Sequence, residues 1–200
     1  MKFFLLKLSA IAAVMALLCV STFSQAEPRY AELPNFHQVN ERLYRGAQPK
    51  KNGLKKLAAL GIKTIINLRG EDKNALAEQQ EAKALGLNYY ALPMPGLSRP
   101  TDEQVAQALA IINNPKNGVV FVHCQHGADR TGVVIACYRM AQENQTAEQA
   151  EVEAKKYGMS WIQFGMKRYL TAYYKKLPRN QPHPSTTKSN VISNPLQLAN

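Results

Sequence analysis

The stretch VVFVHCQHGADRTG, residues 119–132, decides how the rest of the chain is interpreted. It opens with an apolar run of β-branched and aromatic residues that stops at His123 and Cys124, as is typical of a buried strand. A short polar loop containing Gly127 follows, and from Val133 onward apolar residues recur at helical spacing. The stretch therefore predicts a strand, a loop and a helix in direct succession.

Two side chains of this stretch are suited to binding a tetrahedral anion. Cys124 at the end of a strand and Arg130 at the start of a helix can share one small pocket, with the backbone N–H groups between them turned inward. Arg130 offers a planar fork that matches two phosphate oxygens. The same field is expected to lower the pKa of Cys124 from about 8.5 toward the range of about 3.5 to 7.5. The predicted phosphate-binding residues are Gln125, His126, Gly127, Ala128, Asp129 and Arg130.

A thiolate beside a phosphate site predicts nucleophilic chemistry. Cys124 would attack phosphorus to give a cysteinyl phosphate, which water then hydrolyses. Charge that develops on the phosphoryl oxygens would meet the loop amides and Arg130. Thr131 can hydrogen-bond the sulfur and help it leave, and His123 is expected to support the loop and help set the pKa of Cys124. This chemistry needs no cofactor and no metal, and the sequence has no His and Cys cluster at metal-ligand spacing.

These residues resemble the loop of the cysteine-dependent protein tyrosine and dual-specificity phosphatase superfamily, which reads His-Cys, five residues, Arg and Thr-Gly. The resemblance covers roughly residues 36–175, is densest over 119–132, and suggests an atypical, exported bacterial member. It implies a phosphomonoester hydrolase that acts on phosphotyrosine, phosphoserine or phosphothreonine proteins or on small phosphate esters. The alternatives are a phosphoinositide or inositol phosphate phosphatase, and a phosphate-binding module without catalysis.

The general acid is where the sequence departs from this family. Members usually carry an Asp on a loop upstream of the nucleophile, but here that loop, residues 92–100, contains no acid and has Gly96 at the corresponding position. Asp129, beside Arg130, is the replacement we favour, because an Asp at that place serves as the acid in the myotubularin-like lipid phosphatases. The alternative for Asp129 is an ion pair or a loop-shaping hydrogen bond.

Other polar residues near the predicted site have two interpretations each. Asp102 and Glu103 are further candidates for the acid, but acidic residues at the first helical positions also stabilise the helix dipole. Asp72 is a third candidate and equally a turn residue. Arg69 and Arg99 are candidate secondary phosphate contacts. The sequence also suggests that His126 is exposed or contacts substrate, and that Trp161 packs the last helix.

Helical and strand-like patterns alternate from residue 29 to about 177. We expect a hairpin over 36–45, strands over 62–68, 87–92 and 118–123, and helices over 54–58, 74–85, 101–112, 146–157 and 162–177. The helices from Thr101 and Thr146 open with capping boxes, since Gln104 and Gln149 stand three residues on. This alternation predicts a three-layer α/β phosphatase-like domain with a central, largely parallel sheet of four to five strands flanked by helices.

The first 26 residues are typical of a signal peptide. Lys2 and Lys7 precede an uncharged apolar run over residues 8–20, and Ser24-Gln25-Ala26 fits a cleavage site. The run is shorter than the roughly 20 residues that span a bilayer. We therefore expect a chain exported to the periplasm or secreted after cleavage near Ala26, without an integral membrane segment. Residues 27–177 form the predicted dual-specificity-phosphatase-like catalytic domain, and residues 178–200 a disordered tail.

The formal net charge of +11 and the cysteines limit the possible partners. The basic pairs are scattered and no aromatic-interleaved stripe accompanies them, so no specific nucleic acid is expected. The positive charge has two interpretations. It can attract phosphorylated proteins, small-molecule phosphates or lipid phosphates, or it can be a generic solvated basic surface. Cys137 lies on an apolar helical stripe, which favours a buried free thiol over a disulfide with Cys124. We expect a monomer.

Overall fold

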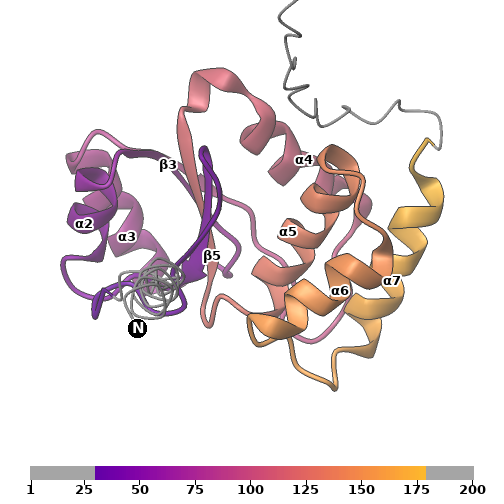
Figure 1. Ribbon diagram of the computed structural model, residues 1–200. Coiled ribbons are helices and arrows are strands. Elements are labelled where there is room, and N and C mark those ends of the chain that lie inside the picture. Colours follow the sequence, from indigo (N-terminus) through magenta and orange to yellow (C-terminus); the bar gives the residue numbers. More distant parts are fainter. Residues whose placement is uncertain (1–29, 179–200) are drawn as a thin grey trace, which may run out of the picture.

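A five-stranded sheet in the order β1-β2-β5-β3-β4 crosses the middle of the computed structural model, which describes residues 30–178 (Figure 1). The strands are β1 His37–Asn40, β2 Leu43–Ala47, β3 Ile62–Asn67, β4 Asn88–Ala91 and β5 Val119–Cys124. Only the β1–β2 hairpin is antiparallel; the other three pairings are parallel. The predicted signal peptide and all but the first residue of the predicted tail lie outside the described residues.

Helices cover both faces of the sheet, so β5 is buried from both sides (Figure 1). One face carries α2 Gly53–Ala59 and α3 Lys73–Ala84. The other face carries α4 Asp102–Asn113, α5 Asp129–Gln142, α6 Ala147–Lys156 and α7 Phe164–Lys176. A 3₁₀ turn, η1 Pro115–Asn117, precedes β5. Phe121 packs in the smaller core under α2 and α3, whereas Val120 and Val122 pack in the larger core under α4–α7. The predicted three-layer α/β architecture is confirmed.

Local signals in the sequence are confirmed at both predicted capping boxes. Thr101 Oγ1 accepts from the Gln104 N–H at 3.2 Å, and Gln104 Oε1 accepts from the Thr101 N–H at 2.9 Å. The Thr146 and Gln149 pair makes the same two bonds at 3.2 and 2.8 Å. Each cap stabilises its helix by about 1 kcal/mol. These bonds fix where α4 and α6 begin.

Two further expectations concern side chains in the helical layer. Cys137 on α5 is a buried free thiol, as predicted, and burial raises its pKa. The packing role predicted for Trp161 is wrong, because 76% of the residue is exposed. Its ring makes an edge-to-face contact with Phe164 at the start of α7, with centroids 6.5 Å apart.

The parallel strands bring their carboxyl ends to one edge of the sheet. Ala47 at the end of β2 stands opposite Cys124, and Asn67 at the end of β3 stands opposite His123. In open α/β sheets ligands bind outside this edge, where the connecting loops diverge.

None of the helices within residues 30–178 combines the length and the apolar composition that crossing a lipid bilayer requires.

Candidate active site

The loop between β5 and α5 holds the predicted nucleophile and the predicted phosphate-binding Arg at its two ends. Cys124 is the last residue of β5 and is 2% exposed, while Arg130 lies in the first turn of α5 and is half-buried. Ala128 is the N-cap of α5 and provides no side-chain hydrogen bond to the helix. The N-terminal N–H groups of α5 therefore point at the loop without a capping side chain, which suits an anion.

Gly127 allows this loop to lie against the end of β2. Its φ is +67°, a backbone conformation that side chains rarely adopt, and a Cβ here would stand 2.4 Å from the carbonyl carbon of Gly46 and 2.6 Å from the nitrogen of Ala47. Both constraints require glycine. The loop is thus pressed onto the neighbouring strand, and this contact fixes its curvature.

Arg45 supports the same loop from β2, a role that the sequence analysis missed. Its Nη2 donates to the Gly127 carbonyl at 2.8 Å, and its guanidinium carbon lies 4.4 Å from the centre of the Tyr157 ring. The residue is 1% exposed, and its Nε and Nη1 have no hydrogen-bond partner within residues 30–178. Burial lowers the pKa of Arg45 to about 10, so the guanidinium is still charged at neutral pH. A buried cation therefore lies beneath the loop.

The environment of Cys124 favours its thiolate. Burial by itself raises the pKa of the thiol, but hydrogen bonds from the side chain and backbone of Thr131, the charge of Arg130 and the backbone of His126 outweigh burial, and the net pKa is lowered. These are the groups expected to stabilise an anionic sulfur. Thr131 Oγ1 is buried, and its hydroxyl has no other hydrogen-bond partner among the described residues.

His123 connects the loop to a buried acid that the sequence analysis did not single out. Its ring is fully buried; Nδ1 lies 3.4 Å from the Cys124 carbonyl oxygen, and Nε2 lies 3.1 Å from Glu78 Oε1. Glu78 Oε2 accepts from Asn67 Nδ2 at 3.0 Å and from the Tyr89 hydroxyl at 3.1 Å. Burial raises the pKa of Glu78, but bonds from His123 and its other neighbours lower it overall. This carboxylate holds the His123 ring behind the nucleophile.

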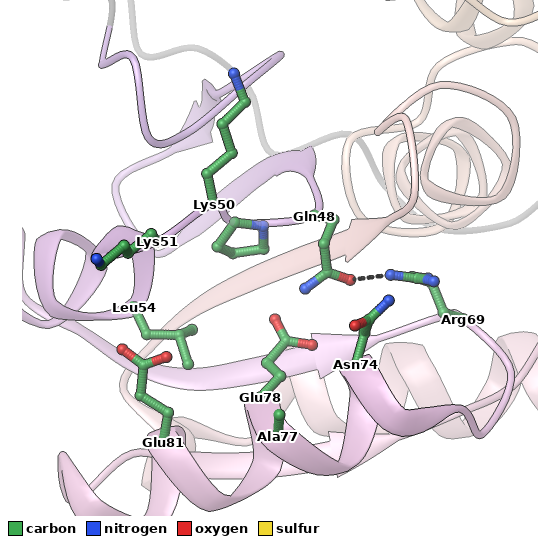
Figure 2. Close-up of a pocket in the computed structure, with 10 residues that line it drawn as sticks. Gln48, Lys50, Lys51, Leu54, Arg69, Asn74, Ala77, Glu78 and Glu81 are labelled. Atoms are coloured by element: carbon green, nitrogen blue, oxygen red, sulfur yellow. Dashed lines mark hydrogen bonds between the residues drawn. The ribbon is translucent and has the colours of Figure 1, made fainter.

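A pocket of about 240 Å³ lies beside the loop, above Glu78 (Figure 2). Gln48 connects the loop and the pocket. Its backbone N–H donates to the Gln125 carbonyl at 3.3 Å, and its side-chain Oε1 accepts from Arg69 Nη1 at 2.8 Å. Arg69 also pairs with Asp72 at 2.7 Å. Arg69, a candidate secondary phosphate contact, is thus already held on two sides next to the loop.

Residues 92–100, which correspond to the acid-bearing loop of the family, are hydrogen-bonded to other parts of the site. The Leu68 carbonyl accepts from the Met94 N–H at 3.2 Å and from Arg130 Nη1 at 3.5 Å, so residues 92–100 and the predicted phosphate-binding Arg share one acceptor. Gln163 Nε2 donates to the Gly96 carbonyl at 3.0 Å. No atom would lie within 4 Å of a Cβ at Gly96, so this position has open space.

Asp129 makes the loop-shaping contact that the sequence analysis weighed against an acid role. Its Oδ1 accepts from the backbone N–H of Ser160 at 2.8 Å and so ties the first turn of α5 to the connection between α6 and α7. An acceptor bond of this kind is compatible with either protonation state at the other carboxyl oxygen. The acid role of Asp129 therefore stays a prediction.

The other candidate acids have structural partners. Asp72 caps α3, accepting from the Ala75 N–H at 2.8 Å. Asp102 begins α4 and pairs with Lys176 at 2.6 Å, and the hydrogen bond from Lys176 lowers the pKa of Asp102. Glu103 is exposed in the same helical turn. Within residues 30–178, no group of three or more His, Cys, Asp or Glu side chains is placed to hold a metal ion.

The loop side chains differ in exposure. Gln125 and His126 are exposed, whereas Gly127 and Ala128 are buried against the sheet edge. The backbone of His126 is held from below, because its carbonyl accepts from Asn35 Nδ2 at 3.0 Å. The loop therefore presents backbone amides and two polar side chains to a ligand.

Comparison with known proteins gives one family and a set of relatives. The profile of the family described as DSP-PTPase phosphatase fused to NAD+ kinase matches residues 25–167. Inositol diphosphatase DSP5 of Arabidopsis thaliana is 28% identical over 137 residues, which are 65% of this chain and 65% of that protein. Dual specificity protein phosphatase TpbA of Pseudomonas aeruginosa is 29% identical over 125 residues, or 62% of this chain and 54% of TpbA. The chain thus spans less than two thirds of each of these two relatives.

A solved structure agrees with the fold described above. The core catalytic domain of the PP-IP phosphatase SIW14 from S. cerevisiae, crystallised with citrate, matches with a TM-score of 0.63 at 25% identity. The match covers 70% of this chain and 86% of the yeast chain. The α/β fold described above is therefore shared with a phosphatase catalytic core.

Proposed function

Because this chain belongs to the DSP-PTPase phosphatase family, we propose that it is a cysteine-dependent phosphomonoester hydrolase with Cys124 as nucleophile. The observation that carries the proposal is the environment of Cys124. Its pKa is lowered by Thr131 and Arg130 in spite of burial, and its sulfur stands at the N-terminus of an uncapped helix. A structural cysteine in an apolar core, such as Cys137 with its raised pKa, shows the opposite behaviour.

In the first step, the Cys124 sulfur attacks phosphorus and the bond from phosphorus to the leaving oxygen breaks. The Arg130 fork and the N-terminal amides of α5 bind the non-bridging oxygens, where charge is present throughout the transfer. The leaving oxygen takes a proton, for which we propose the Asp129 carboxyl as donor. The product of this step is a cysteinyl phosphate.

In the second step, water attacks phosphorus and the sulfur–phosphorus bond breaks. The proton of that water passes to the carboxylate that supplied one before, and inorganic phosphate leaves. The hydroxyl of Thr131 stabilises the departing thiolate, since it already favours the anionic form of Cys124. The enzyme then returns to its starting state without a cofactor.

For the substrate, we propose phosphorylated proteins or small phosphate esters. The exposed side chains of the loop, Gln125 and His126, are uncharged or weakly basic. The loop therefore adds little positive charge for binding an inositol ring that carries several phosphate groups. The second candidate is an inositol phosphate or phosphoinositide, which is favoured by the similarity to DSP5 and to the SIW14 core. Arg69, beside the loop, is the side chain we propose for a second phosphate group.

The test is hydrolysis of a panel by the wild type and by Cys124→Ser. The panel contains a phosphotyrosine peptide, a phosphoserine peptide, a phosphoinositide and an inositol polyphosphate. We expect turnover by the wild type on at least one substrate and none by Cys124→Ser, which preserves the fold and still binds phosphate. A wild type that binds phosphate but turns over nothing would instead favour the non-catalytic module.

We also propose that the chain is exported and acts as a monomer after cleavage near Ala26. The support is the basic start, apolar run and small-residue cleavage site within residues 1–26. N-terminal sequencing of the protein recovered from the cell envelope is expected to begin at Glu27. Recovery of an uncleaved chain from the cytosol would contradict export.

A further inference from the structure

Four large apolar side chains are exposed on two neighbouring segments, the loop before α4 and the loop that leads into α7, whose first residue is Phe164. Leu97 is 81% exposed, Trp161 76%, Phe164 60% and Ile162 51%, and they are half of the eight large exposed apolar residues in the described part of the chain. We call these four the apolar patch. An exposed cluster of this kind on a soluble domain marks an interaction surface, whereas single exposed apolar residues do not.

The two loops touch each other and border the proposed active site. The Gly96 carbonyl accepts from Gln163 Nε2 at 3.0 Å, and a Cβ at Gly165 would lie 3.4 Å from the nitrogen of Arg99. The Ser160 N–H donates to Asp129 in the first turn of α5. The apolar patch therefore lies beside the loop that contains Cys124.

The two segments that carry the apolar patch are basic. Residues 92–101 and 157–177 contain no Asp or Glu. Arg99 and Arg168 are exposed, and Lys167 extends beside the patch, with Nζ donating to the Trp161 carbonyl at 2.9 Å and lying 5.9 Å from the Phe164 ring centre. The nearest acid in sequence, Asp102, is neutralised by Lys176 at 2.6 Å. These two segments therefore combine aromatic groups with a net positive charge, and the other acids at their borders are Asp129 and Glu103.

We propose that the apolar patch docks the protein on a bilayer surface that contains anionic lipids. Tryptophan favours the interface between headgroups and acyl chains, and lysine and arginine near it bind anionic headgroups. A protein partner would more commonly bring hydrogen-bonding complementarity at a polar rim; here the two segments that carry the apolar patch contain Arg99, Lys167 and Arg168 and no acidic residue. Docking in this way would place the β5–α5 loop next to the membrane surface.

The chain supplies its own probe, because Trp161 is its single tryptophan. The full chain is titrated with vesicles of phosphatidylcholine alone and of phosphatidylcholine with phosphatidylglycerol, at low and high salt, while Trp161 emission and sedimentation are followed. We expect a blue shift with anionic vesicles and at least about tenfold stronger binding than to neutral ones, since each basic group contributes about fivefold. High salt is expected to weaken this binding.

Matched variants separate the apolar patch from the rest of the chain, including the apolar run of residues 8–20. Leu97→Ser with Phe164→Ser keeps Trp161 and is expected to weaken binding to anionic vesicles about tenfold or more. Leu76→Ser with Val152→Ser removes two exposed apolar side chains elsewhere, on α3 and α6, and is expected to have no effect. Helix α3 lies across the sheet from α7 (Figure 1). If the first variant melts early, Arg99→Gln with Arg168→Gln replaces it, with an expected loss of about twentyfold.

Three results would overturn the proposal. The first is Trp161 emission that does not respond to anionic vesicles. The second is equal vesicle binding by the patch variants and by the control. The third is an emission shift caused by a phosphotyrosine peptide or by self-association in the absence of lipid, which would assign the surface to a protein substrate or to a second copy of the chain.

Discussion

The guanidinium of Arg45 holds the carbonyl oxygen of Gly127 at 2.8 Å, across 82 residues of sequence. Through this bond the second strand of the sheet determines the shape of the loop that follows the central strand. Gly127 in turn lies so close to Gly46 that no side chain fits between them. β2 therefore holds the loop through one hydrogen bond and one close contact.

Arg45→Met is expected to reduce activity more than stability. The Gly127 carbonyl loses a charge-assisted bond of about 1.5 to 3 kcal/mol, but two guanidinium nitrogens without partners are also removed from the interior. Displacement of the loop by about 1 Å costs on the order of a hundredfold in turnover. Arg45→Lys, which can still donate to the carbonyl, is the control. Thermal unfolding and kcat/KM on an aryl phosphate check this; a strongly destabilised variant with normal kcat/KM would contradict it.

Gly127→Ala is expected to abolish most activity and to destabilise the protein by at least about 1 to 2 kcal/mol, the cost of a positive φ for a residue with a side chain. The methyl group would also overlap the backbone of Gly46 and push the loop away from the sheet edge. Gly96→Ala is the matched control, because its Cβ meets open space without a positive φ. Comparable melting temperatures and activities for the two variants would refute this account of the loop.

Thr131→Val is expected to shift the acid limb of the kcat/KM profile to higher pH. The hydroxyl lowers the pKa of Cys124, so its loss raises that pKa and less thiolate is present at a given pH. The stability of the protein depends on the same pKa. A thiol whose pKa is lowered in the folded state contributes stability above its unfolded pKa of about 8.5. That contribution is lost as the pH falls through the folded pKa. Thr131→Ser serves as control. A pH profile identical to that of the wild type would exclude the hydroxyl from this role.

Asp129→Asn separates the acid from the structural contact, because the amide oxygen can still accept from the Ser160 N–H. If Asp129 protonates the leaving group, the variant loses about a hundredfold or more on an alkyl phosphate and far less on an activated aryl phosphate, whose leaving group needs no proton. Equal losses on both substrates would assign Asp129 to positioning alone. Asp129→Ala, which also removes the acceptor, gives the cost of the structural contact.

The elements and caps could be predicted because their signals are local. Thr101 and Gln104 lie within one helical turn, and the run from Val119 to Cys124 contains its own strand pattern. Tertiary packing does not change the secondary structure that these local patterns predict. The same holds for the position of Cys124 and Arg130 at the two ends of one loop.

The supporting shell of the site could not be predicted, because it forms only when distant strands and helices meet. Arg45 lies about 80 residues before the loop, and its one sequence signal is a charge within the short strand Leu43–Ala47. Glu78 had a similar signal, since it shares a helical face with Ala75 and Ala82, both buried. Trp161 was predicted wrongly because it lies in a loop, where no periodicity indicates which side chains are buried.

The central claim, that the Cys124 thiolate takes the phosphoryl group, is tested most directly by trapping the intermediate. The wild type is mixed with an activated aryl phosphate, quenched in acid within the first turnover and digested for mass spectrometry. The account predicts one phosphoryl group on the peptide that contains Cys124, and none when Cys124→Ser is treated in the same way. Rapid release of phosphate without any phosphorylated Cys124, or with the group on another residue, would contradict it.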